Sequence, residues 1–257
     1  MGEVTGYAAG VPSWADLQTT DPEGARAFYG ALLGWDFEVG PPETGHYTNC
    51  QVRGRIVAGM VGTPQHETPT AWTTYLATDD VDATLRQAAE AGGTVAIETM
   101  EIMDQGRMGG VFDPTGAFIG LWEARAHVGA TLVNEPGCMS WNELATRDLD
   151  AATRFYGALF PYEFVDEDTG GGPRYRTFHI DGGPRGGLLA MGDSWPEGVP
   201  PHWAVYFQVA DTDAAATSAE RLGATVHVPP TDSFYGRFAT LTDPQGASFT
   251  VMASTPA

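Results

Sequence analysis

The sequence predicts an α+β fold in which one unit of structure occurs twice. The segment DPEGARAFYGALLGW at Asp21–Trp35 is matched by DLDAATRFYGALFPY at Asp148–Tyr162. The shared FYGAL and the pattern around it indicate an internal duplication. In each copy, alternating and helical side-chain spacing follow one another twice over. The chain of 257 residues therefore suits two similar domains, expected at 11–124 and 138–254 with a linker at 125–137.

The elements of the first half follow from periodicity and end signals. A helix is expected to begin near 20–22, where an oxygen-bearing cap precedes a proline, and to end at Gly34. Phe28 and Tyr29 lie on its apolar stripe and are expected to pack in the core. A second helix is predicted at 79–91. The predicted strands are 11–18, 37–39, 47–52, 56–61, 71–78, 94–98, 108–112 and 117–123.

The second half follows the same order. Its predicted strands are 139–145, 175–180, 187–191, 202–209 and 247–253, and its predicted helices are 149–160 and 212–222. The tetrapeptide Asp-Pro-x-Gly precedes the last strand of each half, at 113–116 and 243–246, and predicts a tight turn.

Acidic residues outnumber basic ones in this protein. The 33 Asp and Glu against 13 Lys and Arg give a net charge of −20 at pH 7, which disfavours nucleic acid and anionic membranes because both bind basic surfaces. No apolar run approaches the ~20 residues that cross a bilayer, and no signal-peptide pattern begins the chain. Because Cys50 and Cys138 stand at unmatched positions, we expect no disulfide framework and a cytoplasmic location.

Three features together resemble a known superfamily. They are FYG in the first helix of each half, Asp-Pro-x-Gly before the last strand, and four successive strand–helix–three-strand modules. This combination resembles the vicinal oxygen chelate superfamily, which includes glyoxalase I, extradiol dioxygenases, fosfomycin-resistance enzymes and bleomycin-binding proteins. The resemblance covers nearly the whole chain and is similar to two-domain bacterial members of glyoxalase-like or hydroxylase type. It implies two tandem glyoxalase-like domains, each built of two βαβββ modules that form cupped mixed sheets around a ligand.

The metal-using members of that superfamily place His or Glu at set points of the cup. The corresponding positions here are Trp14 and Trp141 on the first strand, Thr73 and Ala204 on the strand before the second helix, Gly120 and Thr250 on the last strand, and 57–59 and 187–189 near the end of the first module. None of them is His, Asp, Glu or Cys, whereas a divalent metal needs three or more such donors. We therefore expect no metal and no cofactor, which disfavours glyoxalase I and extradiol dioxygenase chemistry.

Strand alternation predicts an aromatic cup with a few polar groups. The expected ligand-binding residues are Trp14, Gln18, Thr73, Tyr75, Trp122, Trp141, Tyr206, Gln208 and Met252. The candidate acid or base residues are Asp16, Glu143 and His202. Small-molecule pockets typically combine such an apolar lining with sparse polar anchors. The tryptophans either bind a ligand or fill the space of the missing metal, and the tyrosines either donate hydrogen bonds to a ligand or pack.

Each polar candidate also fits a structural role. A carboxylate at Asp16 or Glu143 would have its pKa raised by an aromatic cup, which suits acid–base chemistry, but buried carboxylates also serve as hydrogen-bond acceptors in the scaffold. His202 has no counterpart in the first half, as expected of a single functional site, and equally fits an exposed position at the mouth of the cup. Arg107 and Arg237 follow glycine in both halves and fit either ion pairs or an anion anchor.

Three functions remain open on these grounds. The first is a metal-free protein, monomeric or homodimeric, that binds a hydrophobic or aromatic small molecule such as a natural product. The second is a metal-independent isomerase, cyclase or lyase of secondary metabolism that uses Asp16 or Glu143 as acid or base. The third is a metalloenzyme with atypical ligands such as Asp16, Glu143 and His202, which could meet only if modules of both repeats converge.

Overall fold

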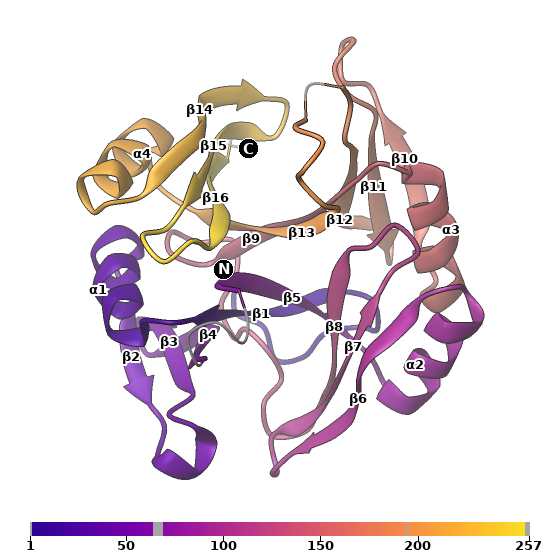
Figure 1. Cartoon of the computed structure of the whole chain (residues 1–257), viewed down its shortest axis with the longest axis horizontal. Helices are drawn as coiled ribbons and strands as arrows, with labels where there is room; N and C mark the ends of the chain where they lie inside the picture. The colour runs from indigo at the N-terminus through magenta and orange to yellow at the C-terminus, as the bar shows by residue number, and fades with distance from the viewer. Residues whose placement is uncertain (1, 64–68, 194, 255–257) are drawn as a thin grey trace.

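Each half of the chain forms its own mixed sheet of eight strands (Figure 1). The computed structural model describes residues 2–63, 69–193 and 195–254. The strands of the first sheet are β1 (Pro12–Thr19), β2 (Asp36–Val39), β3 (Thr48–Val52), β4 (Arg55–Gly62), β5 (Ala71–Ala77), β6 (Thr94–Ile102), β7 (Gly106–Phe112) and β8 (Phe118–Ala124), in the order β2-β3-β4-β1-β5-β8-β7-β6.

The second sheet repeats this order strand for strand. Its members are β9 (Met139–Thr146), β10 (Glu163–Glu167), β11 (Tyr175–Ile180), β12 (Gly183–Ala190), β13 (His202–Gln208), β14 (Thr225–Ser233), β15 (Gly236–Thr242) and β16 (Ser248–Ser254), in the order β10-β11-β12-β9-β13-β16-β15-β14. Modules meet where β1 pairs antiparallel with β5, and β9 with β13. The predicted α+β fold of two βαβββ modules per half is therefore confirmed.

Three strands of the second half were not predicted individually, namely β10, β14 and β15. Strand β14 contains Pro229 and Pro230, and a proline normally argues against a strand because it cannot donate to the ladder. It is tolerated here because β14 lies at the edge of its sheet, where one side of the strand has no ladder to complete. Strand β10 is the opposite edge and is short.

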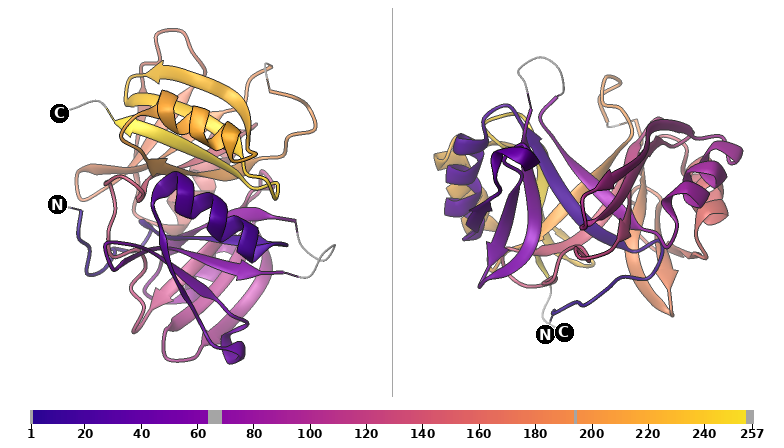
Figure 2. Two further views of the ribbon diagram at one scale, coloured as in Figure 1. Left: turned by 90° about the vertical axis from the view of Figure 1, so that its left-hand side faces the viewer. Right: turned by 90° about the horizontal axis from the view of Figure 1, so that it is seen from below.

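The helices are α1 (Pro22–Leu33), α2 (Val81–Glu90), α3 (Leu149–Leu159) and α4 (Thr212–Arg221). Each begins at an aspartate whose side chain accepts a backbone N–H of the first turn. Helix α1 contacts α4, and α2 contacts α3, so that the helices form two pairs at opposite ends of the molecule (Figures 1 and 2). Along the part of the chain that the structure covers, no helix combines the length and apolar character needed to span a bilayer.

The two sheets pack back to back and curl away from each other. Thr74 of β5 donates to Asn142 of β9 across this interface (2.7 Å), and both side chains are buried. Since neighbours along a strand point to opposite faces, Thr73, Tyr75 and Glu143 project to the outer, concave faces. We call the concave face of β1–β8 the first cup and that of β9–β16 the second cup. The two cups open on opposite sides of the molecule (Figure 1).

A reciprocal pair of hydrogen bonds joins the halves. The Tyr29 hydroxyl of α1 donates to Asp243 Oδ2 in the second half (2.9 Å), and Tyr156 of α3 donates to Asp113 Oδ2 in the first half (3.0 Å). Both tyrosine side chains are almost fully buried, which confirms that Tyr29 packs in the core. The tyrosine of each FYG motif therefore donates a hydrogen bond to the aspartate of the Asp-Pro-x-Gly turn in the other half.

Candidate functional site

A buried carboxylate lies at the floor of the first cup. Asp16 of β1 pairs with Gly59 of parallel β4 and with Thr73 of antiparallel β5. Asp16 Oδ2 accepts hydrogen bonds from the hydroxyls of Tyr47 (3.2 Å) and Tyr75 (3.3 Å). Trp14 Nε1 in turn donates to the Tyr47 hydroxyl (3.0 Å).

The second cup repeats this chain of contacts with glutamate in place of aspartate. Glu143 of β9 pairs with Gly187 of β12, and its Oε1 accepts from the Tyr206 hydroxyl of β13 (3.0 Å). Tyr175 is its second hydrogen-bond partner, and Trp141 Nε1 donates to the Tyr175 hydroxyl (2.9 Å). In each cup one indole, two phenols and one carboxylate are thus joined in a hydrogen-bonded chain.

Burial and hydrogen bonding set the protonation of these groups. Burial raises the pKa of Asp16 to about 6, although hydrogen bonds from Tyr47 and Tyr75 lower it in part. Burial likewise raises the pKa of Glu143 against the opposing effect of its tyrosine partners. The pKa values of Tyr75 and Tyr206 are raised well above 10 by burial and by the neighbouring carboxylate, so both remain donors.

Sequence pattern alone does not indicate Tyr47 and Tyr175 as site residues, although each donates to the carboxylate of its cup. Tyr47 directly precedes β3 and Tyr175 is the first residue of β11, so each was assigned only to the start of a strand. One feature of the sequence could have indicated them: a tyrosine stands at the start of the corresponding strand in both repeats.

The tyrosines cover the glycines beside the carboxylates. A Cβ atom on Gly59 would lie 1.9 Å from the Tyr47 hydroxyl, and one on Gly187 would lie 2.0 Å from the Tyr175 hydroxyl. The ring of Tyr75 covers Gly120 in the same way. Aromatic rings therefore occupy the space of side chains at these positions.

This close packing predicts the effect of adding a methyl group. Gly187→Ala should destabilise the protein by about 1–3 kcal/mol, because the new Cβ displaces Tyr175. Gly183→Ala is the matched control on the same strand, since a Cβ there meets open space. Urea unfolding of both variants measures the difference; equal stabilities would contradict the contact over Gly187.

The donor set does not fit a divalent metal. The hydrogen-bond partners of Asp16 and of Glu143 are protonated phenols, whereas such an ion needs three or more converging His, Cys or carboxylate donors. Across the described residues, no group of three or more His, Cys, Asp and Glu is arranged to hold an ion. The proposed alternative ligands do not converge either, because Asp16 lies in the first cup and Glu143 in the second.

The remaining sequence-predicted residues divide between the cups. The first cup holds Gln18, Thr73 and Trp122, and the second holds Ala204, His202, Gln208 and Met252. The ring of His202 contacts the Pro200 carbonyl through Nδ1 (2.8 Å) and faces Trp195, which places it at the mouth of the second cup and not among the hydrogen-bond partners of Glu143.

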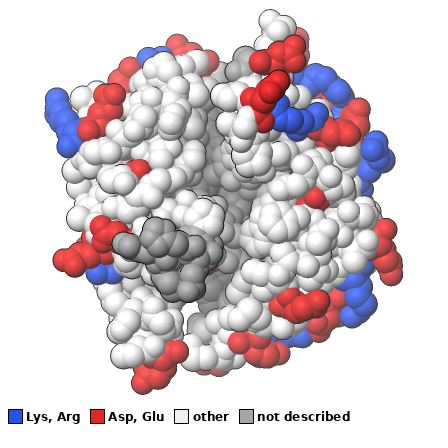
Figure 3. Space-filling view, viewed as in Figure 1, with Lys and Arg blue, Asp and Glu red and all other residues white. Residues whose placement is uncertain are grey.

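The repeated arginines form ion pairs. Arg107 pairs with Asp82, Glu101 and Glu123, and Arg237 with Asp213 and Asp232. These contacts favour the structural role for both residues over the anion anchor. Acidic and basic side chains lie mainly around the periphery of the face shown in Figure 3.

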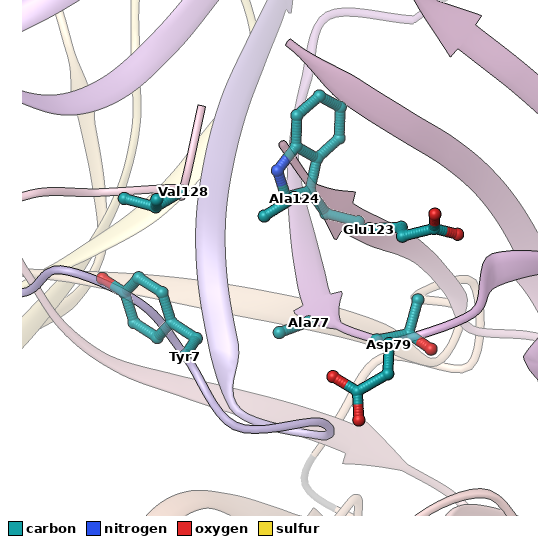
Figure 4. A pocket seen from close by; sticks show the side chains of 8 residues that line it. Tyr7, Ala77, Asp79, Glu123, Ala124 and Val128 are labelled. Atoms are coloured by element: carbon teal, nitrogen blue, oxygen red, sulfur yellow. The ribbon is translucent and has the colours of Figure 1, made fainter. Parts of the chain in front are cut away.

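A pocket of about 230 Å³ lies beside the first cup, where β5 and β8 end. Tyr7 of the N-terminal segment and Val128 of the linker line one side of it, and Asp79 and Glu123 the other (Figure 4). Glu123 is already engaged by Arg107 and by the backbone N–H of Val81, so its carboxylate has a structural use.

Comparison with known proteins identifies the family. The model of the Glyoxalase/Bleomycin resistance protein/Dioxygenase superfamily matches residues 12–121 and again 138–251. The chain belongs to this superfamily. Two solved structures share its fold. The 2,3-dioxygenase LapB from Pseudomonas sp. KL28 superposes with a TM-score of 0.65 at 14% sequence identity, over 97% of this chain and 94% of that chain. A Mn(II)-bound glyoxalase from Novosphingobium aromaticivorans superposes with a TM-score of 0.63 at 18% sequence identity, over 95% of this chain and 83% of that chain.

Two curated superfamily relatives align over almost the whole chain. The protein named "Putative glyoxylase CFP32" of Mycobacterium tuberculosis (strain CDC 1551 / Oshkosh) is 42% identical, covering 97% of each chain. "Anthracycline biosynthesis protein DnrV" of Streptomyces peucetius is 36% identical, covering 97% of this chain and 95% of the relative.

Proposed function

We propose that the protein binds a flat, hydrophobic aromatic molecule in an aromatic-lined cup, without a metal ion. The observation that carries this proposal is the replacement of coordinating side chains by rings: tyrosines stand over Gly59, Gly120 and Gly187, and Trp14 and Trp141 occupy the first-strand positions. Such a lining offers stacking surface and a few hydrogen bonds, as small-molecule pockets do. The relative named for anthracycline biosynthesis supports a polycyclic aromatic natural product as the ligand class.

Tryptophan fluorescence tests this proposal directly. We expect saturable quenching when the metal-free protein is titrated with polycyclic aromatic compounds, including an anthracycline. The same titration with EDTA present should give the same curve. A flat response across a broad aromatic panel, or quenching that appears only after a divalent metal is added, would count against it.

A metal-independent isomerase, cyclase or lyase is the second candidate function. It is favoured by the raised pKa values of Asp16 and Glu143, because an acid or base works best with a pKa near the working pH. Glu143→Gln and Asp16→Asn keep the shape of each side chain and remove its proton transfer. Turnover lost by at least about a hundredfold with ligand binding retained would support catalysis; a loss of folding would support the scaffold role.

A further inference from the structure

The two cups differ in how far their matched side chains reach solvent. In the first cup, Trp14 and Tyr75 are only 3% and 6% exposed. In the second cup, the corresponding Trp141 and Tyr206 are half-buried. A ligand that stacks on an indole or a phenol needs the ring face to be reachable, so the second cup is the more open of the two.

The linker explains the closure of the first cup. The His127 ring packs edge-on against Trp14 at a centroid distance of 4.4 Å and lies 5.5 Å from the ring of Trp122. The Trp122 indole also donates to the His127 carbonyl (2.9 Å). Burial lowers the pKa of His127 to about 4, so the ring is neutral and packs as an aromatic group. This side chain covers the indole that a ligand in the first cup would use.

An aromatic turn takes the corresponding place in the second cup. Ser233 pairs with Gly236, so Phe234 and Tyr235 form the tip of the β14–β15 hairpin. The Tyr235 ring stacks on Trp141 at a centroid distance of 6.2 Å, with an angle of 22° between the planes. It also faces Tyr175 at 6.2 Å. A flat ring in van der Waals contact with two others needs about 7 Å between their planes, so the tip must move outward to admit one.

The two residues at this tip are not those that two-residue hairpin turns usually contain. Hairpins with two-residue tips usually use Asn or Gly, which tolerate positive φ. Phe234 and Tyr235 are aromatic and neither has positive φ. Phe234 is 88% exposed, although burying a side chain of this size and polarity is favourable. At the corresponding turn of the first half stand polar Asp104 and Gln105, so the aromatic tip is specific to the second half.

The strand position beside Glu143 carries a smaller side chain than its counterpart in the first cup. Glu143 pairs with Ala204 on β13, where the first cup has the larger Thr73 beside Asp16. On its other side Glu143 pairs with Gly187, which the Tyr175 hydroxyl covers. The carboxylate accepts from Tyr206 and Tyr175, and its oxygens have further lone pairs to accept a donor from a ligand.

We propose that the chain holds one ligand, in the second cup, as a flat aromatic ring sandwiched between Trp141 and Tyr235. Phe234 covers its outer edge, and a hydroxyl group of the ligand donates to Glu143. The first cup, which His127 covers, binds no ligand and has a structural role only. This assignment rests on the proposed function and names the cup, the clamp and the chemical class, a hydroxylated polycyclic aromatic.

Titration calorimetry with a dihydroxyanthraquinone and with its dimethyl ether tests the assignment. We expect one site per chain and weaker binding of the ether by about tenfold, since it cannot donate to Glu143. The double variant Phe234→Ser/Tyr235→Ser should lose about tenfold or more in affinity for both probes. Because both residues are exposed, this variant should fold normally. The matched control Asp104→Ser/Gln105→Ser, at the corresponding turn, should bind within about twofold of the unmodified protein.

The possible failures are distinguishable. Two sites per chain, or affinity lost by the control variant and kept by Phe234→Ser/Tyr235→Ser, would overturn the choice of the second cup while leaving aromatic binding intact. Equal binding of the two probes would overturn the hydroxyl contact to Glu143. An unmodified protein that binds neither probe nor any member of the aromatic panel would overturn the proposed function and this inference together.

Discussion

Asp243→Ala should lower the free energy of unfolding by about 4 kcal/mol, the largest effect we expect from a single substitution outside the apolar core. Asp243 Oδ1 accepts the backbone N–H groups of Gln245, Gly246 and Ala247, while Oδ2 accepts the hydroxyl of Tyr29 from the other half. Alanine leaves these donors without their acceptor, and both Tyr29 and Ala247 are fully buried. Unfolding in guanidinium chloride, followed by circular dichroism, measures the loss.

Two milder variants separate the turn from the contact between halves. Asp243→Asn keeps an acceptor for the turn and should cost less than the alanine change. Tyr29→Phe removes only the hydroxyl and should cost about 1–2 kcal/mol, because Asp243 then loses one of its partners. Asp113→Ala should resemble Asp243→Ala, since it removes the reciprocal contact to Tyr156. A cost below about 1 kcal/mol for Asp243→Ala would contradict this account.

The order of strands and helices could be predicted from the sequence, because the repeat and the side-chain periodicity can both be recognised within short segments of the chain. The strand alternation around Trp14 and Asp16, and again around Trp141 and Glu143, correctly indicated which side chains share a face. The helical stripe placed Tyr29 in the core, but periodicity holds no information about Asp243, which lies far along the chain. The contact between the two motifs therefore needed the structure.

The rest of the candidate site depends on residues outside regular strands. His127 comes from the linker, Tyr47 from the end of a loop, and Phe234 and Tyr235 from a hairpin tip. The paths of the linker, loop and hairpin over the concave face of each sheet determine where these side chains lie. Side-chain alternation along a single strand holds no information about those paths. The difference between the two cups, on which the choice of site rests, is for the same reason a property of tertiary structure alone.

Stability should fall as the pH rises through about 6, and Asp16→Asn should remove the part of this dependence that Asp16 causes. The folded-state pKa of Asp16 lies about 2 units above its ordinary value, so the folded protein binds this proton more tightly than the unfolded chain. The contribution is fully present below the unfolded pKa near 3.8 and is lost as the pH rises through the folded pKa of about 6. Two units correspond to about 3 kcal/mol.

Urea unfolding of both proteins from about pH 4 to about pH 7.5 isolates this contribution, because every other titrating group is common to the pair. We expect the Asn variant to gain about 2–3 kcal/mol relative to the unmodified protein across that interval. A difference that stays constant with pH would show that Asp16 titrates alike in the folded and unfolded states. Burial would then not outweigh the hydrogen bonds from Tyr47 and Tyr75, and the case for proton transfer in the first cup, which depends on the raised pKa of Asp16, would end.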